Sequence, residues 1–312
     1  MALDRGQPLM SAVVVLAGGS GGAKLARGML DVAGTLTVIA NTADDIEIYG
    51  AHVSPDPDLC TFWLADCIDE RGWGLRGDSF AVMDGLRDLG VDVWFNLGDR
   101  DLAIGIERAR RLGEGARLTE TLGELGRALG LRARVLPMTD ETVRTWVQVD
   151  ARWMAFQEFM IHAEGMGSIQ NTVLLGVDSA QATPEVLDAI SSADAIVIGP
   201  SNPVISIGPI LAVADMRQAV IDSTAPVVAI SPLVGGAVVK GPTEAFMRWA
   251  GHPLSTAAVA SIYDGLIDGI VTDDEDVGTG IAVLHADTLM RDADDRRRVA
   301  EQTLRFAEAL SH

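Results

Sequence analysis

Short apolar runs recur along the chain, and stretches with a helical pattern of apolar and polar residues separate them. Each run is rich in Val, Ile and Leu, which is typical of a strand buried on both faces of a parallel sheet. Because the runs alternate with helical patterns, we expect βαβ units and an α/β fold with a doubly wound, mostly parallel sheet. The runs are residues 12–17, 36–40, 91–97, 172–177, 195–199, 226–231, 266–272 and 280–285.

The pattern changes between residues 59 and 165. Residues 104–112 and 118–129 have the spacing of amphipathic helices rich in Arg, Leu and Glu, and residues 133–136 and 143–149 have the composition of strands that return to the main body. We therefore expect a core made of residues 10–58 and 166–312, with residues 59–165 as an inserted, mainly helical subdomain. The charged amphipathic segment 292–310 is expected to be an outer helix.

Composition narrows the range of partners. The chain has 24 basic and 44 acidic residues, which gives a formal charge of -20. Such a chain repels polyanions, which argues against nucleic acid or an anionic membrane as its main partner. Cys60 and Cys67 lack the spacing of a metal finger or a redox pair, so we expect reduced thiols in a cytoplasmic protein.

A glycine-rich segment, LAGGSGGAKL at residues 16–25, links the first apolar run to a helical pattern. The first N–H groups of such a helix have no internal partner and can bind an anion, and glycine lets the backbone approach it. Lys24 is followed by Leu25, which excludes a P-loop, and the third glycine of the dinucleotide pattern is missing. We interpret the loop as a phosphate site, the alternative being a turn needed only for close helix packing. Its residues are Gly18, Gly19, Ser20, Gly21 and Gly22.

Carboxylates gather in two adjacent loops. Asp44 and Asp45 follow the predicted strand 36–40, and Asp56 and Asp58 lie in SPDPD at residues 54–58. These are oxygen ligands of the kind that Mg²⁺ accepts when it also holds substrate phosphates. Helix N-capping is the alternative for any one of them, Asp58 above all. Their clustering favours a metal-binding role for at least one.

Other predicted strand ends carry polar residues where ligands of open α/β sheets collect. Ser201 and Asn202 lie between two prolines in a rigid turn that suits phosphate or ribose contacts. Lys240 follows a glycine pair and could reach a diphosphate. The predicted strand 91–97 leads into residues that form either a helix cap with a local ion pair or a contact to an acceptor substrate. These are Asp99, Arg100 and Asp101.

Eight segments together resemble, in the same order, the 2-phospho-L-lactate transferase family of coenzyme F420 biosynthesis. They are GGSGGAKL, NTADD, SPDPD, GWGLRGDSF, NLGDRDLA, FQEF, GPSNPVISIGPIL and SPLVGGAVVKGP, and they cover roughly residues 13–280. The resemblance implies a Rossmann-like nucleotide-binding core. It also implies transfer of 2-phospho-L-lactate or phosphoenolpyruvate from a guanosine diphosphate ester to the deazaflavin Fo, with release of GMP. Mg²⁺ as cofactor and a homodimer are further expectations from the family.

The resemblance also implies roles for individual residues. Asp44 and Asp58 match the metal-binding aspartates of the family, residues 18–22 its donor loop, and Ser201 with Asn202 its phosphate-contacting turn. Attack of an alcohol on an anhydride phosphorus needs placement and charge neutralisation more than a covalent nucleophile. A carboxylate could take the proton of the acceptor hydroxyl, with Asp45 and Asp99 as candidates. The candidate acceptor contacts are Asn41, Arg100 and Asp101.

Three segments depart from the family pattern. Ile104-Gly105 stands where Thr-His is usual, Arg144-Thr145-Trp146-Val147 replaces Glu-Thr-His-Val, and DLCTFWL at residues 58–64 replaces Asp-Thr-Val-Leu-Tyr-Thr-Leu. These changes leave the nucleotide half intact and alter the expected acceptor or acyl pocket. Two alternatives therefore stay open. One is a family transferase with another acceptor, and the other is a nucleotide-sugar-binding regulator without transferase activity.

Overall fold

The computed structural model describes residues 8–275 and 278–311. Seven strands of this part of the chain form one parallel sheet in the order β14-β13-β10-β9-β1-β2-β5. The predicted α/β class with a doubly wound parallel sheet is therefore confirmed. The strands are β1 (Met10–Ala17), β2 (Ala33–Ala40), β5 (Arg134–Pro137), β9 (Ala195–Ile198), β10 (Val227–Ile230), β13 (Gly269–Thr272) and β14 (Ala282–His285).

The sheet has a topological switch point between β1 and β9. From β1 the chain extends the sheet through β2 to β5, and it then returns to β9 on the other side of β1. Leu16 of β1 pairs with Ile198 of β9, so the carboxyl ends of these two strands lie side by side. In open α/β sheets this is the place where ligands bind.

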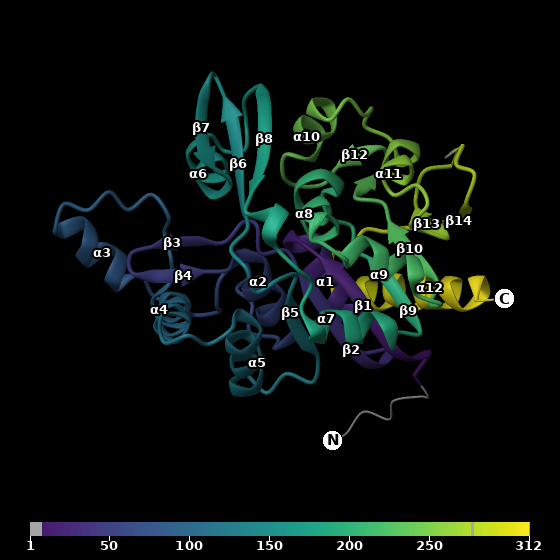
Figure 1. Ribbon diagram of the computed structural model, residues 1–312, viewed down its shortest axis with the longest axis horizontal. Helices are drawn as coiled ribbons and strands as arrows, with labels where there is room; N and C mark the ends of the chain where they lie inside the picture. The colour runs from purple at the N-terminus through teal and green to yellow at the C-terminus, as the bar shows by residue number, and fades with distance from the viewer. Residues whose placement is uncertain (1–7, 276–277, 312) are drawn as a thin grey trace.

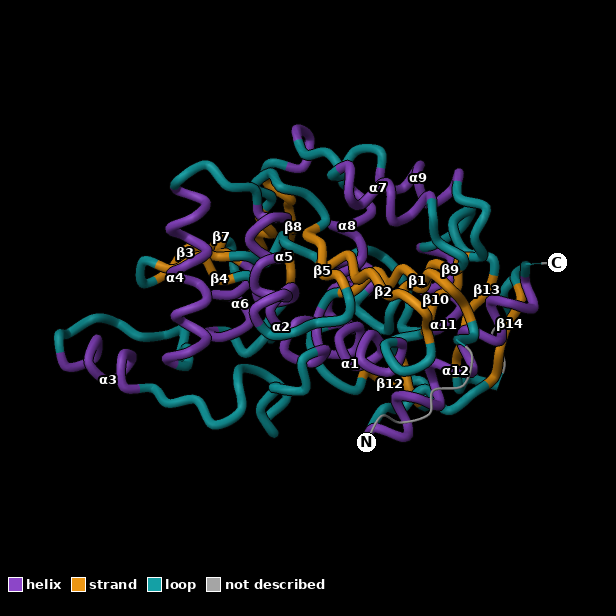
Figure 2. Tube along the Cα trace, turned by 90° about the horizontal axis from the view of Figure 1, so that it is seen from below, coloured by secondary structure: helices purple, strands orange, loops and turns teal. Residues whose placement is uncertain are grey.

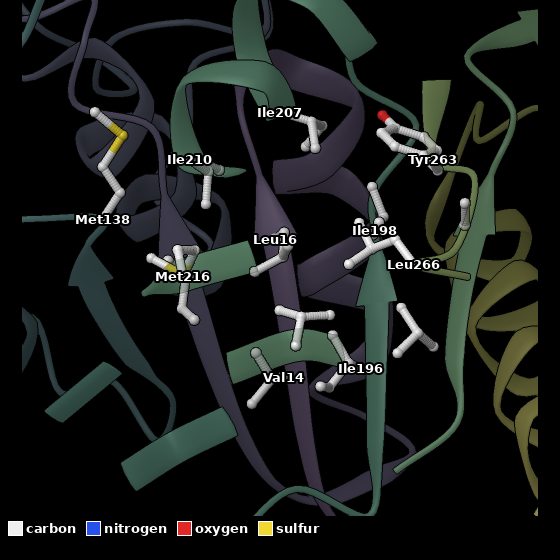
Figure 3. Close-up of a cluster of buried hydrophobic side chains, with 14 of the residues drawn as sticks. Val14, Leu16, Met138, Ile196, Ile198, Ile207, Ile210, Met216, Tyr263 and Leu266 are labelled. Atoms are coloured by element: carbon white, nitrogen blue, oxygen red, sulfur yellow. The ribbon is translucent and has the colours of Figure 1, made fainter. Parts of the chain in front are cut away.

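Alternate residues of the strands face two apolar layers, as the two-residue period of a strand requires. On one face, Val14, Leu16, Ile196 and Ile198 pack under a helical layer (Figure 3). Its helices are α7 (Pro184–Ser191), α8 (Gly208–Ala212), α9 (Met216–Asp222) and α11 (Thr256–Ile262).

On the opposite face, the side chains between these positions, such as Val13, Val15 and Val197, pack against three helices. Figure 2 shows α7 and α9 on one side of the sheet and α1 and α12 on the other. The three helices are α1 (Gly19–Met29), α2 (Pro55–Leu64) and α12 (Ala293–Leu310), the last of which is the outer helix expected from segment 292–310.

Two smaller units stand beside the central layers (Figure 1). In one, helix α4 packs on a hairpin of two short strands. Its elements are β3 (Ile46–Ile48), β4 (Ala51–Val53), α3 (Ala81–Asp88), α4 (Asp99–Gly113) and α5 (Leu118–Ala128). The other is a three-stranded antiparallel sheet whose buried face, with Val147, packs on Phe159 and Phe246. Its elements are β6 (Arg144–Val149), β7 (Arg152–Ala155), α6 (Phe156–His162), β8 (Ile169–Leu175) and α10 (Thr243–Trp249).

The remaining short elements lie in connections. They are a 3₁₀ turn at Val177–Ser179 and a π-helical turn at Pro203–Ile207, together with the two-residue strands β11 (Leu233–Val234) and β12 (Ala237–Val238). Among the helices of residues 8–275 and 278–311, none combines the length and the apolar character that crossing a bilayer requires.

The expected insertion 59–165 is not one unit in the structure, because its parts pack in different places. Residues 81–128 are helical in large part, but α2 runs into this range and packs against α1 through Cys60 and Leu64, and β5 is hydrogen-bonded to β2 in the central sheet. Strands β6 and β7 belong to one sheet with β8, beyond residue 165. Long-range pairing rather than local composition sets these boundaries.

Two strand predictions need correction. Residues 91–97 form no strand: Val91 and Asp92 are exposed, and Val93 and Phe95 pack against the cluster around Met83 and Leu97 instead of pairing with a neighbour. The predicted strand 172–177 exists as β8 but lies in the three-stranded antiparallel sheet rather than the central one.

Candidate active site

The glycine loop and the turn after β9 contact each other at the switch point. The Gly18 N–H donates to Ser201 Oγ at 3.3 Å. A Cβ on Gly21 would lie 2.2 Å from the Pro200 carbonyl oxygen, and one on Gly22 would lie 2.8 Å from Ala17 Cβ. Close packing therefore explains why glycine stands at positions 21 and 22. This agrees with the alternative interpretation of the loop, a turn needed for close helix packing.

Gly19 is different. Its φ of +70° lies in the left-handed region, and a Cβ there would meet no atom within 4 Å. This residue turns the chain from β1 into α1 and leaves open space in front of the first turn of the helix. A backbone requirement, rather than a packing requirement, accounts for glycine at this position.

Asp56 holds the start of α1 in place. Its Oδ1 accepts the Gly19 N–H at 2.7 Å and its Oδ2 accepts a hydrogen bond from Asn41 Nδ2 at 3.1 Å. Asn41 is fully buried, and its Oδ1 accepts the Ala43 N–H, so its side chain supports Asp56 and the turn after β2. Asn41 is absent from the lining of the cleft described next, whereas its predicted role was an acceptor contact.

A cleft of about 550 Å³ opens at the switch point. It brings together all of the predicted nucleotide-binding residues except Gly22. Asn202 uses its Oδ1 to cap the turn that follows, accepting the Val204 N–H at 2.9 Å, while its buried Nδ2 has no hydrogen-bond partner in the described part of the chain. The lining includes Gly18, Gly19, Ser20, Gly21, Lys24, Asp44, Asp56, Ser201, Asn202, Lys240 and Thr288.

The two carboxylates of the cleft are buried and close enough to repel each other. Burial, together with the charges of Asp56 and Asp45, raises the pKa of Asp44 well above its usual value. Burial also raises the pKa of Asp56 to about 6, against the hydrogen bonds from Gly19 and Asn41 that lower it. The ionised forms are therefore costly without a cation.

Asp45 lies next to Asp44 but points to a different set of partners. Its Oδ2 accepts a hydrogen bond from Ser54 Oγ at 2.6 Å and lies 3.0 Å from His52 Nε2. Burial alone would lower the pKa of His52, but hydrogen bonds with Asp45 and Glu47 raise it above the ordinary value. The other oxygen of Asp45 is buried and has no partner among the described residues.

Asp58 is paired with Arg108 of α4 rather than turned to the cleft. Both guanidinium Nη atoms contact its carboxylate, Nη1 at 3.0 Å, and Arg108 also donates to the His52 carbonyl oxygen at 3.0 Å. Arg108 and Asp58 are each at least nine-tenths buried. Arg108 was not among the residues predicted from the sequence, although its spacing from Leu102 and Gly105 places it on the buried face of the helix.

Asp99, Arg100 and Asp101 form the first turn of α4 instead of following a strand. Asp99 accepts hydrogen bonds from Ser79 Oγ at 2.6 Å and from the Ala81 and Val82 N–H groups, and these hydrogen bonds lower its pKa. The Arg100 N–H donates to Asp78. Burial and the charge of Asp58 raise the pKa of Asp101 to about 7. None of the three lines the cleft.

The carboxylates fit a divalent cation. In residues 8–275 and 278–311 no three His, Cys, Asp or Glu side chains converge closely enough to hold an ion by themselves. However, Asp44 Oδ1 is buried without a partner in the same ranges, and Asp44 and Asp56 both line the cleft. Mg²⁺ usually takes one or two carboxylates and completes its shell with substrate phosphates and water, so Asp44 and Asp56 suit it. Asp44 and Asp58 are both predicted metal ligands, and of these Asp58 is paired with Arg108 instead.

A side pocket of about 140 Å³ adjoins the cleft and shares Asp44, Phe156 and Gln157 with it. Asp45, Arg144 and Trp146 also line it, so the departure at residues 144–147 lies beside the carboxylates.

The departure at residues 104–105 has a packing explanation. A Cβ on Gly105 would lie 3.0 Å from Ala51 Cβ, so glycine lets α4 approach β4, and Ile104 packs on the cluster around Phe62. Neither residue lines the cleft or the side pocket.

Comparison with known proteins gives consistent matches over most of the chain. Residues 13–306 match the family described as 2-phospho-L-lactate transferase CofD. The chain is 40% identical to a phosphoenolpyruvate transferase of Streptomyces griseus over 96% of this chain and 99% of that protein. It is 37% identical to a 2-phospho-L-lactate transferase of Methanopyrus kandleri over 96% and 98%. A solved structure of a upf0052 family member from Bacillus halodurans has the same fold, with a TM-score of 0.61 and 18% identity over 94% of this chain and 99% of that one.

Proposed function

The chain belongs to the 2-phospho-L-lactate transferase CofD family, and on that premise we propose that it is a Mg²⁺-dependent transferase of coenzyme F420 biosynthesis. It transfers 2-phospho-L-lactate or phosphoenolpyruvate from a guanosine diphosphate ester to the terminal hydroxyl of the deazaflavin Fo and releases GMP. The observation that carries the proposal is the cleft at the switch point, where the glycine loop, the Ser201-Asn202 turn and two buried carboxylates meet.

The diphosphate of the donor binds across the switch point. The cleft opens at the N-terminus of α1, where Gly19, Ser20 and Gly21 line it, and a helix N-terminus favours anions. Ser201 Oγ and the unpartnered Nδ2 of Asn202 supply further donors from the other side. These groups orient the phosphorus for in-line attack without forming a covalent bond to it.

Asp44 and Asp56 would hold Mg²⁺, which, when bound, supplies positive charge to the diphosphate and to the departing GMP. Asn41 fixes the Asp56 carboxylate at 3.1 Å, so the direction of that ligand is set before substrate binds. Asp58 neutralises the buried charge of Arg108 and does not contact the donor.

The acceptor hydroxyl enters through the side pocket between Asp45 and Trp146. Asp45 takes the proton of this hydroxyl, because its free oxygen is buried beside the pocket while Ser54 and His52 hold the other oxygen. Asp99 accepts hydrogen bonds from Ser79 and from the first N–H groups of α3, which favours Asp45 among the two predicted bases. The pocket is small, so it admits the hydroxyl end of the acceptor and leaves its ring system outside.

Calorimetric titration tests the proposal, with GDP and Fo titrated separately in the presence of Mg²⁺. Binding of both, followed by metal-dependent formation of GMP from the guanylylated acid, is the expected result. Binding of GDP without Fo would redirect the search to other alcohols, as the change at residues 144–147 suggests. Binding of nucleotides without any transfer would favour the regulator and contradict the transferase.

A further inference from the structure

The chain contains 24 basic side chains, of which two, Lys24 and Lys240, are lysines and the rest are arginines. Both lysines line the cleft. Arginine carries almost every positive charge of this chain, and the two ammonium groups both lie in this cleft. The ammonium is a compact point charge, whereas the guanidinium is a wide planar fork, so the two are not interchangeable in a narrow site.

Lys24 is set up to meet an anion. It lies four residues after Ser20 on α1 and therefore on the same face as the phosphate loop. Its Nζ lies 5.8 Å from the centre of the Trp63 ring and 3.5 Å from the Met290 carbonyl oxygen. Within the described ranges it forms no ion pair, although the chain carries a formal charge of -20.

Other cations surround Lys24. Arg296 of α12 lies over the same Trp63 ring at 5.0 Å. Burial lowers the pKa of Lys24, and the positive charges of Arg296 and Lys240 lower it further. An anion bound among these groups would relieve their mutual repulsion.

Thr288 gives an independent indication of a ligand at this end of the cleft. It is 4% exposed and lines the cleft, yet its hydroxyl has no hydrogen-bond partner in the part of the chain that the structure describes. An unsatisfied buried hydroxyl is costly, and a ligand oxygen would satisfy it. Leu289 and Met290, the next residues, also line the cleft, and Met290 carries the carbonyl that Lys24 contacts.

We propose that Lys24, Lys240 and Thr288 form an anion subsite beside the glycine loop, which holds a phosphate or carboxylate oxygen of the donor. The identity of the donor in this inference rests on the proposed function. That the ligand is an anion rests on the residues that line the cleft. Lys24 and Thr288 then bind substrate rather than stabilise the fold.

Calorimetry with GDP, GMP and phosphoenolpyruvate as probes tests the subsite. We expect Lys24→Met to weaken binding of the recognised probe about 10- to 100-fold, as loss of a charged hydrogen bond predicts. A loss with GDP but not GMP would assign the second phosphate, and a loss with phosphoenolpyruvate alone would assign the carboxylate. Either supports the subsite. Lys24→Arg should bind less tightly than wild type, because a wide guanidinium does not reproduce the contacts of a compact ammonium and Arg296 already lies over the same Trp63 ring.

Thr288→Val separates binding from folding. Removal of an unpartnered buried hydroxyl should leave the melting temperature unchanged or higher while weakening the same probe about 2- to 10-fold. Arg305→Met, which removes one exposed positive charge from α12, is the matched control and should bind like wild type.

The subsite is overturned if Lys24→Met binds all three probes as Arg305→Met does. Failure of wild type to bind GDP would contradict the proposed function instead. The subsite is then judged with phosphoenolpyruvate and inorganic pyrophosphate. Weaker binding by Lys24→Met supports it, and equal or absent binding by both proteins rejects it.

Discussion

At the scale of single residues, the cleft concentrates negative charge where water has little access. Asp44 and Asp56 are 5% and 7% exposed, and, besides burial, the charge of Asp56 raises the pKa of Asp44. Some residues here have two roles, since Asp56 holds the Gly19 N–H and also faces the cleft. A change at such a position therefore alters both stability and binding.

The raised pKa of Asp56 predicts that the free energy of unfolding depends on pH. Between its ordinary value of 3.8 and about 6, the folded chain keeps a proton that the unfolded chain has released. The free energy of unfolding therefore falls by about 3 kcal/mol through this group as the pH rises across that interval. We expect Asp56→Asn to gain stability relative to wild type by about this amount between pH 4 and pH 7, in urea titrations without Mg²⁺.

Asp188→Asn, a change of an exposed carboxylate on α7, is the control and should keep a constant difference from wild type. If the free energy of unfolding of Asp56→Asn differed from that of wild type by the same amount at every pH, Asp56 would be ionised at no unusual cost.

At the scale of elements, the Asp58–Arg108 pair ties α2 to α4, and Arg108 extends the link to β4. The sequence alone predicts that Asp58→Ala gives a folded protein without metal-dependent transfer. The structure changes this prediction, because the substitution leaves the Arg108 charge buried and unpaired. We expect Asp58→Ala to lose about 3–5 kcal/mol of the free energy of unfolding.

Urea titration at neutral pH measures this loss. Asp44→Asn, which removes a buried carboxylate with one unpartnered oxygen in the described part of the chain, should be as stable as wild type or more so. The double variant Asp58→Ala with Arg108→Met should recover part of the loss, since no charge is left unpaired. A fully stable Asp58→Ala would restore Asp58 as a candidate metal ligand.

The sequence predicts the central layers well because their strands are buried on both faces, and burial leaves a continuous apolar run in β1, β9 and β10. It fails for residues 91–97, whose apolar side chains fill the gap beside a hairpin rather than a sheet. With that strand lost, the argument that placed Asp99 to Asp101 at the carboxyl edge of the sheet is lost too.

For the site, local motifs identify the loop and the Ser201-Asn202 turn. The pairing of Asp56 with Gly19 and of Asp58 with Arg108 joins residues 37 and 50 positions apart, which no local pattern encodes.

At the scale of the whole molecule, the formal charge of -20 acts against folding and against binding of anionic substrates. In the cleft, the N-terminus of α1 and the two lysines supply positive potential that locally offsets this negative charge. General screening and specific cation binding should therefore stabilise the protein in distinguishable ways.

We expect the melting temperature to rise as KCl is increased from low ionic strength to about 0.2 M, because repulsion among the carboxylates is screened. MgCl₂ at matched ionic strength should raise it further through Asp44 and Asp56. Asp44→Asn should keep the KCl response and lose the extra Mg²⁺ response in thermal-shift measurements. An extra response that persists in this variant would place the cation elsewhere.

The scarcity of lysine has a practical consequence for chemical labelling of this chain. Apart from the terminal α-amino group, its primary amines are those of Lys24 and Lys240, both in the cleft. Because burial and nearby cations lower the pKa of Lys24, its amine is a better nucleophile near neutral pH than an ordinary lysine. An acylating dye or crosslinker therefore reacts with the terminal α-amino group and with the two lysines of the cleft, and its attachment to the lysines becomes a readout of whether the cleft is filled.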